Sequence, residues 1–159
     1  MTDAIEAKLL SLGYHPIHEI QMASTGFVQG LQSLIGTQLP SEYLDFLLRF
    51  PVSGGCSGFV LVHGAATSDF SEDGMYGWDI LYAFDAHRRS TLHDIHAEDS
   101  DKWPGYLAIG RDLLSNRFFM NIADRFGEIF WSEGVRDLHT DFYRIAESFE
   151  QFVERTQFD

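Results

Sequence analysis

YLAIGRDLLSNRFFMNIADRFGEIFWSEG, at residues 106–134, consists of three apolar segments separated by two polar connections. The apolar segments are short and bounded by turn-forming residues, as β-strands are, and they lie at 107–110, 118–122 and 128–131. The second connection ends in Gly127, which can adopt the positive φ of a tight hairpin. The sequence therefore predicts three consecutive strands here, the last two forming a hairpin that ends at Trp131.

Helical periodicity dominates the chain that precedes this segment. Residues 4–12 and 27–35 are predicted helices, the second with an apolar face made of Phe27, Leu31, Leu34 and Ile35. The clearest helix begins at Pro40, which suits the first helical position because its missing N–H costs nothing there. Its apolar stripe has the helical spacing i, i+3, i+4, i+7 and consists of Tyr43, Phe46, Leu47 and Phe50.

Extended and helical patterns alternate in the remainder. Two further strands are predicted at 58–63 and 78–84, with a loop or arm over 65–77 between them. Residues 88–97 are predicted to form a short helix. A C-terminal helix carries Ile145, Ala146, Phe149, Phe152 and Val153 on one face. Its start is left open between Ser148, as a capping residue, and Thr140, which would make FYRIA helical too.

These elements predict an α+β fold. N-terminal helices precede a mostly antiparallel sheet of about five or six strands, and the C-terminal helix packs on that sheet. A chain of 159 residues with 45% hydrophobic and 22% charged residues is expected to form one domain, residues 1–159. Residues 1–20 are interpreted as a possible N-terminal extension.

The charge balance bears on the class of partner. Eleven Lys and Arg against 24 Asp and Glu give a formal net charge of −13, which repels nucleic acid and anionic membranes and attracts basic proteins. Nine acids against two arginines lie between residues 69 and 101, namely Asp69, Glu72, Asp73, Asp79, Asp85, Asp94, Glu98, Asp99 and Asp101. A solvated acidic face that keeps the protein soluble would explain the same stretch.

Two absences from the sequence indicate the compartment. No apolar run is long enough to span a membrane, and the N-terminus lacks the pattern of a secretory signal. A single cysteine cannot form an internal disulfide, which is consistent with a reducing environment. A cytoplasmic location is therefore expected.

Four motifs, in this order, resemble the SUKH superfamily over residues 24–155. They are Leu39-Pro40 before a helix, Ile109-Gly110 followed by Asp112, a hairpin ending in Phe130-Trp131, and Ser148-Phe149 with Phe152. The chain departs from the family pattern at three turns. Pro51-Val52-Ser53 precede the two glycines where Asn-Gly-Gly is usual. Leu113-Leu114-Ser115 stand where glycines usually precede an Asn. Ser132-Glu133-Gly134 follow the Trp in place of an acid and a His.

The resemblance implies a binding function without catalysis. The superfamily contains bacterial toxin-immunity proteins, which bind a cognate toxin that is often a nuclease, and the fungal Knr/Smi regulators of cell-wall assembly. An immunity protein acting on a basic toxin is the favoured hypothesis, and a Knr/Smi-like interaction or regulatory scaffold is the alternative. The toxin's identity and the oligomeric state are not readable from the sequence.

Site residues follow from these two lines of reasoning. The predicted partner-binding residues are Asp69, Glu72, Asp73, Glu98, Asp99, Asp101 and Trp103. The residues interpreted as structural are Leu39, Pro40, Phe46, Gly110, Trp131 and Phe149. No catalytic residue, no metal ligand and no cofactor are predicted.

Enzymatic alternatives depend on histidine and cysteine. His87, His93 and His96 lie close in sequence, and His93 and His96 would share one helical face, so a metal-dependent enzyme is a distant alternative. The spacing does not match His-Glu-x-x-His. Cys56 lies in a glycine-rich turn with no Lys or Arg between Phe50 and Ser71, so nothing nearby in sequence would activate it. A half-buried, inert thiol is expected.

Overall fold

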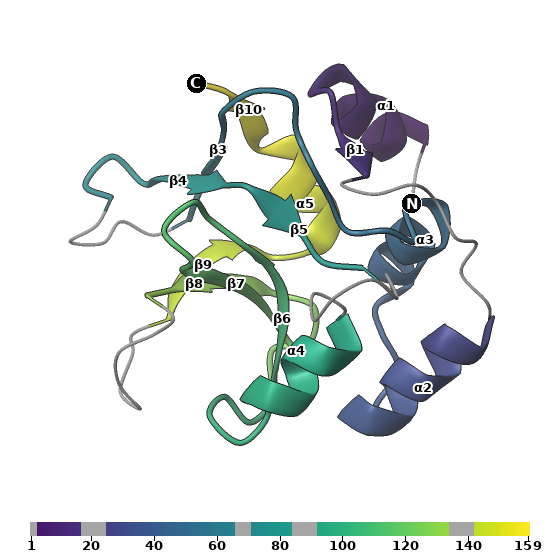
Figure 1. The fold of residues 1–159 in the computed structure, drawn as a ribbon. Helices are drawn as coiled ribbons and strands as arrows, with labels where there is room; N and C mark the ends of the chain where they lie inside the picture. The colour runs from purple at the N-terminus through teal and green to yellow at the C-terminus, as the bar shows by residue number, and fades with distance from the viewer. Residues whose placement is uncertain (1–2, 17–24, 66–70, 84–91, 134–141) are drawn as a thin grey trace.

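The computed structural model describes residues 3–16, 25–65, 71–83, 92–133 and 142–159, and it confirms the α+β class (Figure 1). Its helices are α1 (Asp3–Ser11), α2 (Thr25–Ile35), α3 (Ser41–Arg49), α4 (Leu92–Asp99) and α5 (Phe149–Glu154). Its strands are β1 (His15–Pro16), β2 (Gly54–Gly55), β3 (Val60–His63), β4 (Met75–Trp78), β5 (Ile80–Leu81), β6 (Tyr106–Arg111), β7 (Arg117–Asn121), β8 (Ile129–Ser132), β9 (Tyr143–Ala146) and β10 (Thr156–Phe158).

The strands form two antiparallel sheets. The larger sheet has seven strands in the order β1-β2-β5-β6-β7-β8-β9, and the smaller has three in the order β10-β3-β4. The three strands predicted from residues 106–134 are confirmed as β6, β7 and β8, which are consecutive neighbours in the larger sheet. Gly127 has a φ of +90° in the β7–β8 connection, as predicted.

Two predicted boundaries around β4 are wrong. The loop predicted over 65–77 includes β4, whose residues pair with β3 from Met75 to Trp78. The single strand predicted over 78–84 is divided instead: Trp78 belongs to the smaller sheet, whereas Leu81 pairs with Gly110 in the larger one. The chain therefore passes from one sheet to the other at Asp79, a change that no period in the sequence marks.

The C-terminal helix starts after Ser148, and the Thr140 alternative is wrong. The Ser148 side chain accepts a hydrogen bond from the backbone N–H of Gln151 at 3.1 Å, which caps the first turn of α5. Residues 143–146 form β9 and pair with β8, so FYRIA is largely extended. A Ser cap and a strand immediately before it are mutually consistent, because the capping residue has extended backbone angles.

Helix α3 forms the centre of the core. Tyr43, Phe46 and Leu47 are buried on it, and the Phe46 ring lies 4.7 Å from that of Phe149 on α5. The helix begins one residue later than predicted: Pro40 is its N-cap, and the Pro40 carbonyl accepts from Leu44 N at 2.9 Å. On α2 the predicted face is only partly buried. Leu31 is inside, while Phe27 and Leu34 are exposed.

Helix α5 connects the N-terminal helices to both sheets. It packs against α1 and α3 and contacts β9. The ring of Phe152 lies 5.5 Å from Phe118 on β7 and 6.2 Å from Trp78 on β4. At the other end of the molecule, α4 packs on β6 and α2 (Figure 1). Residues 3–16 share in this core, since Ile5, Leu9 and Leu12 are buried.

Candidate functional site

The predicted acidic residues fall at two separate places. Glu72 and Asp73 are exposed in the turn that leads into β4, whereas Glu98 and Asp99 end α4 and an exposed Asp101 follows. The chain enters β6 shortly after Asp101. Asp79, just beyond β4, donates its N–H to the Arg111 carbonyl at the far end of β6. The two groups therefore lie toward opposite ends of β6 (Figure 1), and Asp69 is outside the described residues.

The Asp73 carboxylate is held in place by its own turn. It accepts hydrogen bonds from the Met75 N–H at 3.0 Å and from the Ser71 hydroxyl at 3.1 Å. These donors stabilise the charged form and lower the pKa of Asp73, with the Met75 N–H as the main cause. Because its folded-state pKa is depressed, this carboxylate keeps its charge to lower pH than a free aspartate.

Trp103 has one side in the core and one side toward solvent. Its half-buried ring lies 5.0 Å from that of Phe119 on β7, and the Lys102 ammonium lies 5.7 Å above the ring. The ring belongs to a cluster on one face of the larger sheet, in which Tyr106 stacks on Phe142 at 4.2 Å. Tyr106 and Phe142 were not singled out from the sequence, because their proximity depends on a cross-sheet contact.

The residues interpreted as structural are buried. Leu39 and Pro40 precede α3, and Gly110 lies in β6 against β5. Trp131 donates its indole N–H to the Asp112 carboxylate at 3.3 Å, and its ring lies 5.3 Å from Tyr76. Asp112, the acid that follows Ile109-Gly110, is thus held in place, and its hydrogen bond with Trp131 connects the end of β6 to β8.

Sequence reasoning did not find the turn at the end of the β6–β7 hairpin as a site. The Asp112 carboxylate accepts from the N–H groups of Leu114 at 2.8 Å and Asn116 at 2.9 Å, and from the Asn116 side chain at 2.9 Å. Leu113 and Leu114 are exposed at its tip. The sequence did contain a signal for this turn, because these two leucines stand where the family usually has glycines.

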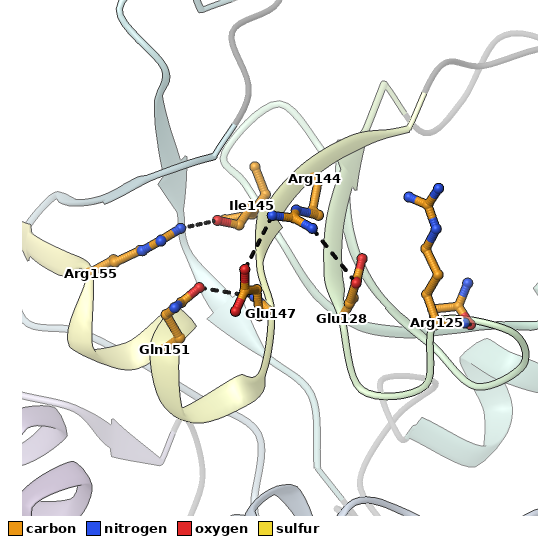
Figure 2. A network of polar contacts seen from close by, with 8 residues as sticks. Arg125, Glu128, Arg144, Ile145, Glu147, Gln151 and Arg155 are labelled. Carbon is orange, nitrogen blue, oxygen red and sulfur yellow. Dashed lines mark hydrogen bonds and ion pairs between the residues drawn. The ribbon is translucent and has the colours of Figure 1, made fainter.

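A polar network joins the edge strand β9 to its neighbours (Figure 2). Arg144 lies 3.7 Å from Glu128 and 3.3 Å from Glu147, and the Glu147 N–H donates to the Gln151 side chain at 3.0 Å. Arg155 donates to the Ile145 carbonyl at 2.8 Å, and the Ala65 N–H reaches the same oxygen at 3.1 Å. These contacts satisfy groups at the sheet edge, which makes the network structural and limits strand addition there.

Of the groups considered for catalysis, the structure describes Cys56 and His96. Burial raises the pKa of the Cys56 thiol to about 12, so the thiolate needed for nucleophilic attack is scarce near neutral pH. His96 is buried on α4, the His93 side chain is not among the described groups, and His87 lies outside the described residues. Within the described part of the chain, no three His, Cys, Asp or Glu side chains are grouped to hold a metal.

A shallow cleft of about 350 Å³ lies at the C-terminal end of α2, lined by Gln29, Gln32, Ser33, Gly36, Thr37 and Gln38. None of these lining residues is charged, so the cleft offers no acid–base pair. Among the described helices, none has the length and apolar character needed to cross a bilayer.

Comparison with known proteins agrees with the motifs. Residues 22–155 match the SMI1 / KNR4 family (SUKH-1). The chain is also 30% identical over 139 residues to the SPbeta prophage-derived uncharacterized protein YokK of Bacillus subtilis (strain 168), covering 77% of this chain and 69% of that protein. With a match over most of its length and the four motifs in their expected structural positions, the chain belongs to the SMI1 / KNR4 family (SUKH-1).

Proposed function

We propose that this protein is a cytoplasmic immunity protein that neutralises a cognate toxin by forming a stoichiometric complex with it. The family match over residues 22–155 carries the proposal, because the superfamily contains bacterial toxin-immunity proteins. The protein would bind the toxin and cover its active-site groove. No bond is made or broken by this chain in such a mechanism.

The net charge of −13 supports a basic partner, such as a nuclease that binds phosphate through Lys and Arg. Opposite net charges accelerate association by steering the two proteins together, and the effect weakens as salt screens the field. Glu72, Asp73 and Asp101 are exposed and contribute to that field. Trp103 supplies a partly exposed aromatic ring beside Asp101, a residue type favoured in binding hot spots.

The titratable groups with shifted pKa values that bear on catalysis, Cys56 and Asp73, are consistent with a protein that binds a partner without catalysis. The raised pKa of Cys56 argues against a nucleophile, and the depressed pKa of Asp73 argues against a general base near neutral pH. Exposed carboxylates that stay charged serve electrostatic attraction well.

The proposed function is tested by stoichiometry. Products of the genes adjacent to this one are expressed in a sensitive bacterium, and any toxic product is purified and titrated with this protein. Equimolar protein is expected to abolish the toxic activity, because each inhibitor molecule occupies one active site. A tenfold smaller amount should leave most of the activity.

Two results would contradict the proposal. Suppression by strongly substoichiometric amounts would indicate an enzyme that modifies or degrades the toxin. The absence of any neighbouring product that is toxic and binds this protein would remove the immunity function. Bovine serum albumin at the same concentration controls for nonspecific protection.

The acidic group at the end of α4, residues 98–101, is expected to act on the rate of association. Reversing Glu98, Asp99 and Asp101 together to Lys should slow association with the toxin severalfold and flatten its salt dependence, since peripheral charges act mainly on the on-rate. Association rate constants are measured by stopped flow between 50 and 500 mM salt, a range set by screening lengths from about 14 to 4 Å.

A matched triple reversal separates local from net charge. Asp45, Glu154 and Asp159 are exposed on α3, at the end of α5 and at the end of the chain, and their reversal changes the net charge equally. It is expected to slow association less than the first triple variant. Equal rates for the wild type and the first variant at all salt concentrations would show that residues 98–101 do not face the toxin.

A further inference from the structure

We propose that the turn formed by residues 71–73 is an autoinhibitory contact, which keeps the free edge of β4 from pairing with the β4 strand of a second copy of this chain. Strand β4 forms one edge of the smaller sheet, whose order is β10-β3-β4 (Figure 1). An edge strand presents backbone groups that a further strand can bind, and proteins generally cover or interrupt such edges. The inference is independent of the proposed function, because it concerns how this protein avoids self-association.

The pairing of β3 with β4 determines which backbone groups of β4 lie on the free edge. The Gly64 N–H donates to the Gly74 carbonyl at 2.8 Å, so these two residues form a hydrogen-bonded pair that continues the ladder. In an antiparallel ladder every second residue bonds to the neighbouring strand, and the residues between them point the opposite way. With Met75 opposite His63 in the register, the N–H and carbonyl groups of Met75 and Gly77 therefore face away from β3.

Two side chains of the turn bind the backbone groups of Met75. The Met75 N–H donates to the Asp73 carboxylate at 3.0 Å, and the Met75 carbonyl accepts from the Ser71 hydroxyl at 2.7 Å. Ser71 is buried, and its hydroxyl lies 3.1 Å from the Asp73 carboxylate. The carboxylate and the hydroxyl thus take the places in which a neighbouring strand would put its carbonyl and its N–H.

The next outward-facing positions are Gly77 and Asp79. The Asp79 N–H donates to the Arg111 carbonyl at 2.9 Å, because the chain has reached the larger sheet at this point. Within the part of the chain that the structure describes, the Gly77 backbone forms no hydrogen bond on this edge. Met75 is covered by the turn and Asp79 is bound to β6, so Gly77 is the open position of β4.

Two copies could pair fully through this edge only if Met75 were open as well. A two-fold axis at Tyr76 would place Met75 of each antiparallel strand opposite Gly77 of the other, and both pairs could exchange hydrogen bonds in both directions. An axis at Gly77 would leave this residue to pair with its own copy, between Met75 and Asp79, which are already engaged. The turn therefore restricts a second copy to a contact far smaller than a stable interface.

Phe59 would make an open edge attractive to a second strand. Its ring is 49% exposed, and its Cζ atom would stand 3.1 Å from a β-carbon added to Gly77, so the ring lies beside the edge. A strand paired with Gly77 would cover part of this ring, and burial of apolar surface is favourable. The turn thus protects a position at which association would otherwise be favoured.

Light scattering of the purified protein over a concentration series tests the inference. Ser71→Ala with Asp73→Ala removes both contacts to Met75, and it should strengthen self-association at least about tenfold, because the freed N–H and carbonyl can bond to a second copy. Hydrogen exchange at residues 75–77 should slow in the associated form. Adding Gly77→Pro should return self-association to the wild-type level, since proline has no N–H and the Gly77 N–H does not bond to β3.

Asp112→Ala is the matched control. The Asp112 carboxylate also accepts from backbone N–H groups in a turn, those of Leu114 at 2.8 Å and Asn116 at 2.9 Å, and its removal changes the net charge equally. That turn joins β6 and β7, which both lie inside the larger sheet, so its loss opens no strand edge. Self-association of Asp112→Ala should stay at the wild-type level.

Denaturant midpoints of all variants are compared with that of the wild type, so that partial unfolding is not read as strand pairing. If the double variant does not fold, Asp73→Ala alone, a change at an exposed side chain, should still strengthen self-association, though less. Self-association that matches the wild type in both variants would overturn the inference, as would an equal increase in Asp112→Ala. An increase that Gly77→Pro does not reverse would place the contact elsewhere and overturn the inference too. Each of these results leaves the proposed function intact.

Discussion

Replacing Phe46 by alanine is expected to lower the free energy of unfolding by about 3–5 kcal/mol, the range for removing a buried Phe side chain. Phe46 is fully buried on α3, and its ring lies 4.7 Å from Phe149, 5.6 Å from Phe50 and 6.0 Å from Tyr14. Phe149 on α5 and Tyr14 come from parts of the chain far from α3, so these rings cannot fill the space without moving those segments. Urea denaturation followed by tryptophan fluorescence measures the loss.

Leu48→Ala on the same helix is the matched control. Leu48 is 48% exposed, so its replacement removes little buried surface and should change the free energy of unfolding by less than about 0.5 kcal/mol. A similarly small loss for Phe46→Ala would contradict the burial of the α3 stripe. It would point to that stripe as an exposed interface.

Helices and strands whose apolar residues follow a clear local pattern were predictable from the sequence. The apolar stripe of α3 follows the spacing i, i+3, i+4, i+7, and its residues Tyr43, Phe46 and Leu47 are buried. The strands β6 to β8 were predicted because each is apolar and separated from the next by a polar turn. In these segments, local preference and tertiary packing favour the same structure, so the structure can be predicted from the sequence.

Short strands were not predictable in the same way. β1, β2 and β5 have two residues each, too few for any alternation to be recognised, and they exist because the chain passes beside a formed sheet. β10 follows α5 with one residue between them and pairs with β3, almost a hundred residues earlier in sequence. Such pairing is decided by tertiary contacts, which a local pattern does not contain.

The candidate site also combines features that the sequence predicted with features that depend on tertiary contacts. Asp73 and Asp101 belong to the same acidic stretch of the sequence. They nevertheless lie toward opposite ends of β6, because the chain crosses from the smaller to the larger sheet between them. Composition predicted the sign of the surface charge. It could not predict the ordered turn at Asp112, which depends on hydrogen bonds from Leu114, Asn116 and the distant Trp131.

Gly110→Ala is expected to destabilise the protein by about 3 kcal/mol, near the upper end of the range for overpacking. Gly110 pairs with Leu81, and a β-carbon at Gly110 would stand 2.7 Å from the Ile80 carbonyl oxygen and 3.0 Å from a Leu81 methyl carbon. The Ile80 oxygen belongs to the backbone of β5 and cannot move aside as a flexible side chain would. Relief of the clash requires β5 to separate from β6, which divides the larger sheet between these two neighbouring strands. Urea denaturation of the purified variant measures the loss.

Gly30→Ala makes the same chemical change and is expected to affect the stability of the protein in the opposite direction. Gly30 lies within α2, and in the described part of the chain no atom beyond its neighbouring residues and the backbone of its own helix stands within 4 Å of the position of an added β-carbon. Alanine there should stabilise the protein by about 0.5–1 kcal/mol, because a glycine inside a helix loses more conformational entropy on folding. A difference of several kcal/mol between the two variants is therefore expected from one added methyl group. If Gly110→Ala proved as stable as Gly30→Ala, the close approach of β5 to β6 would be refuted, and with it the structural role assigned to the Ile-Gly motif.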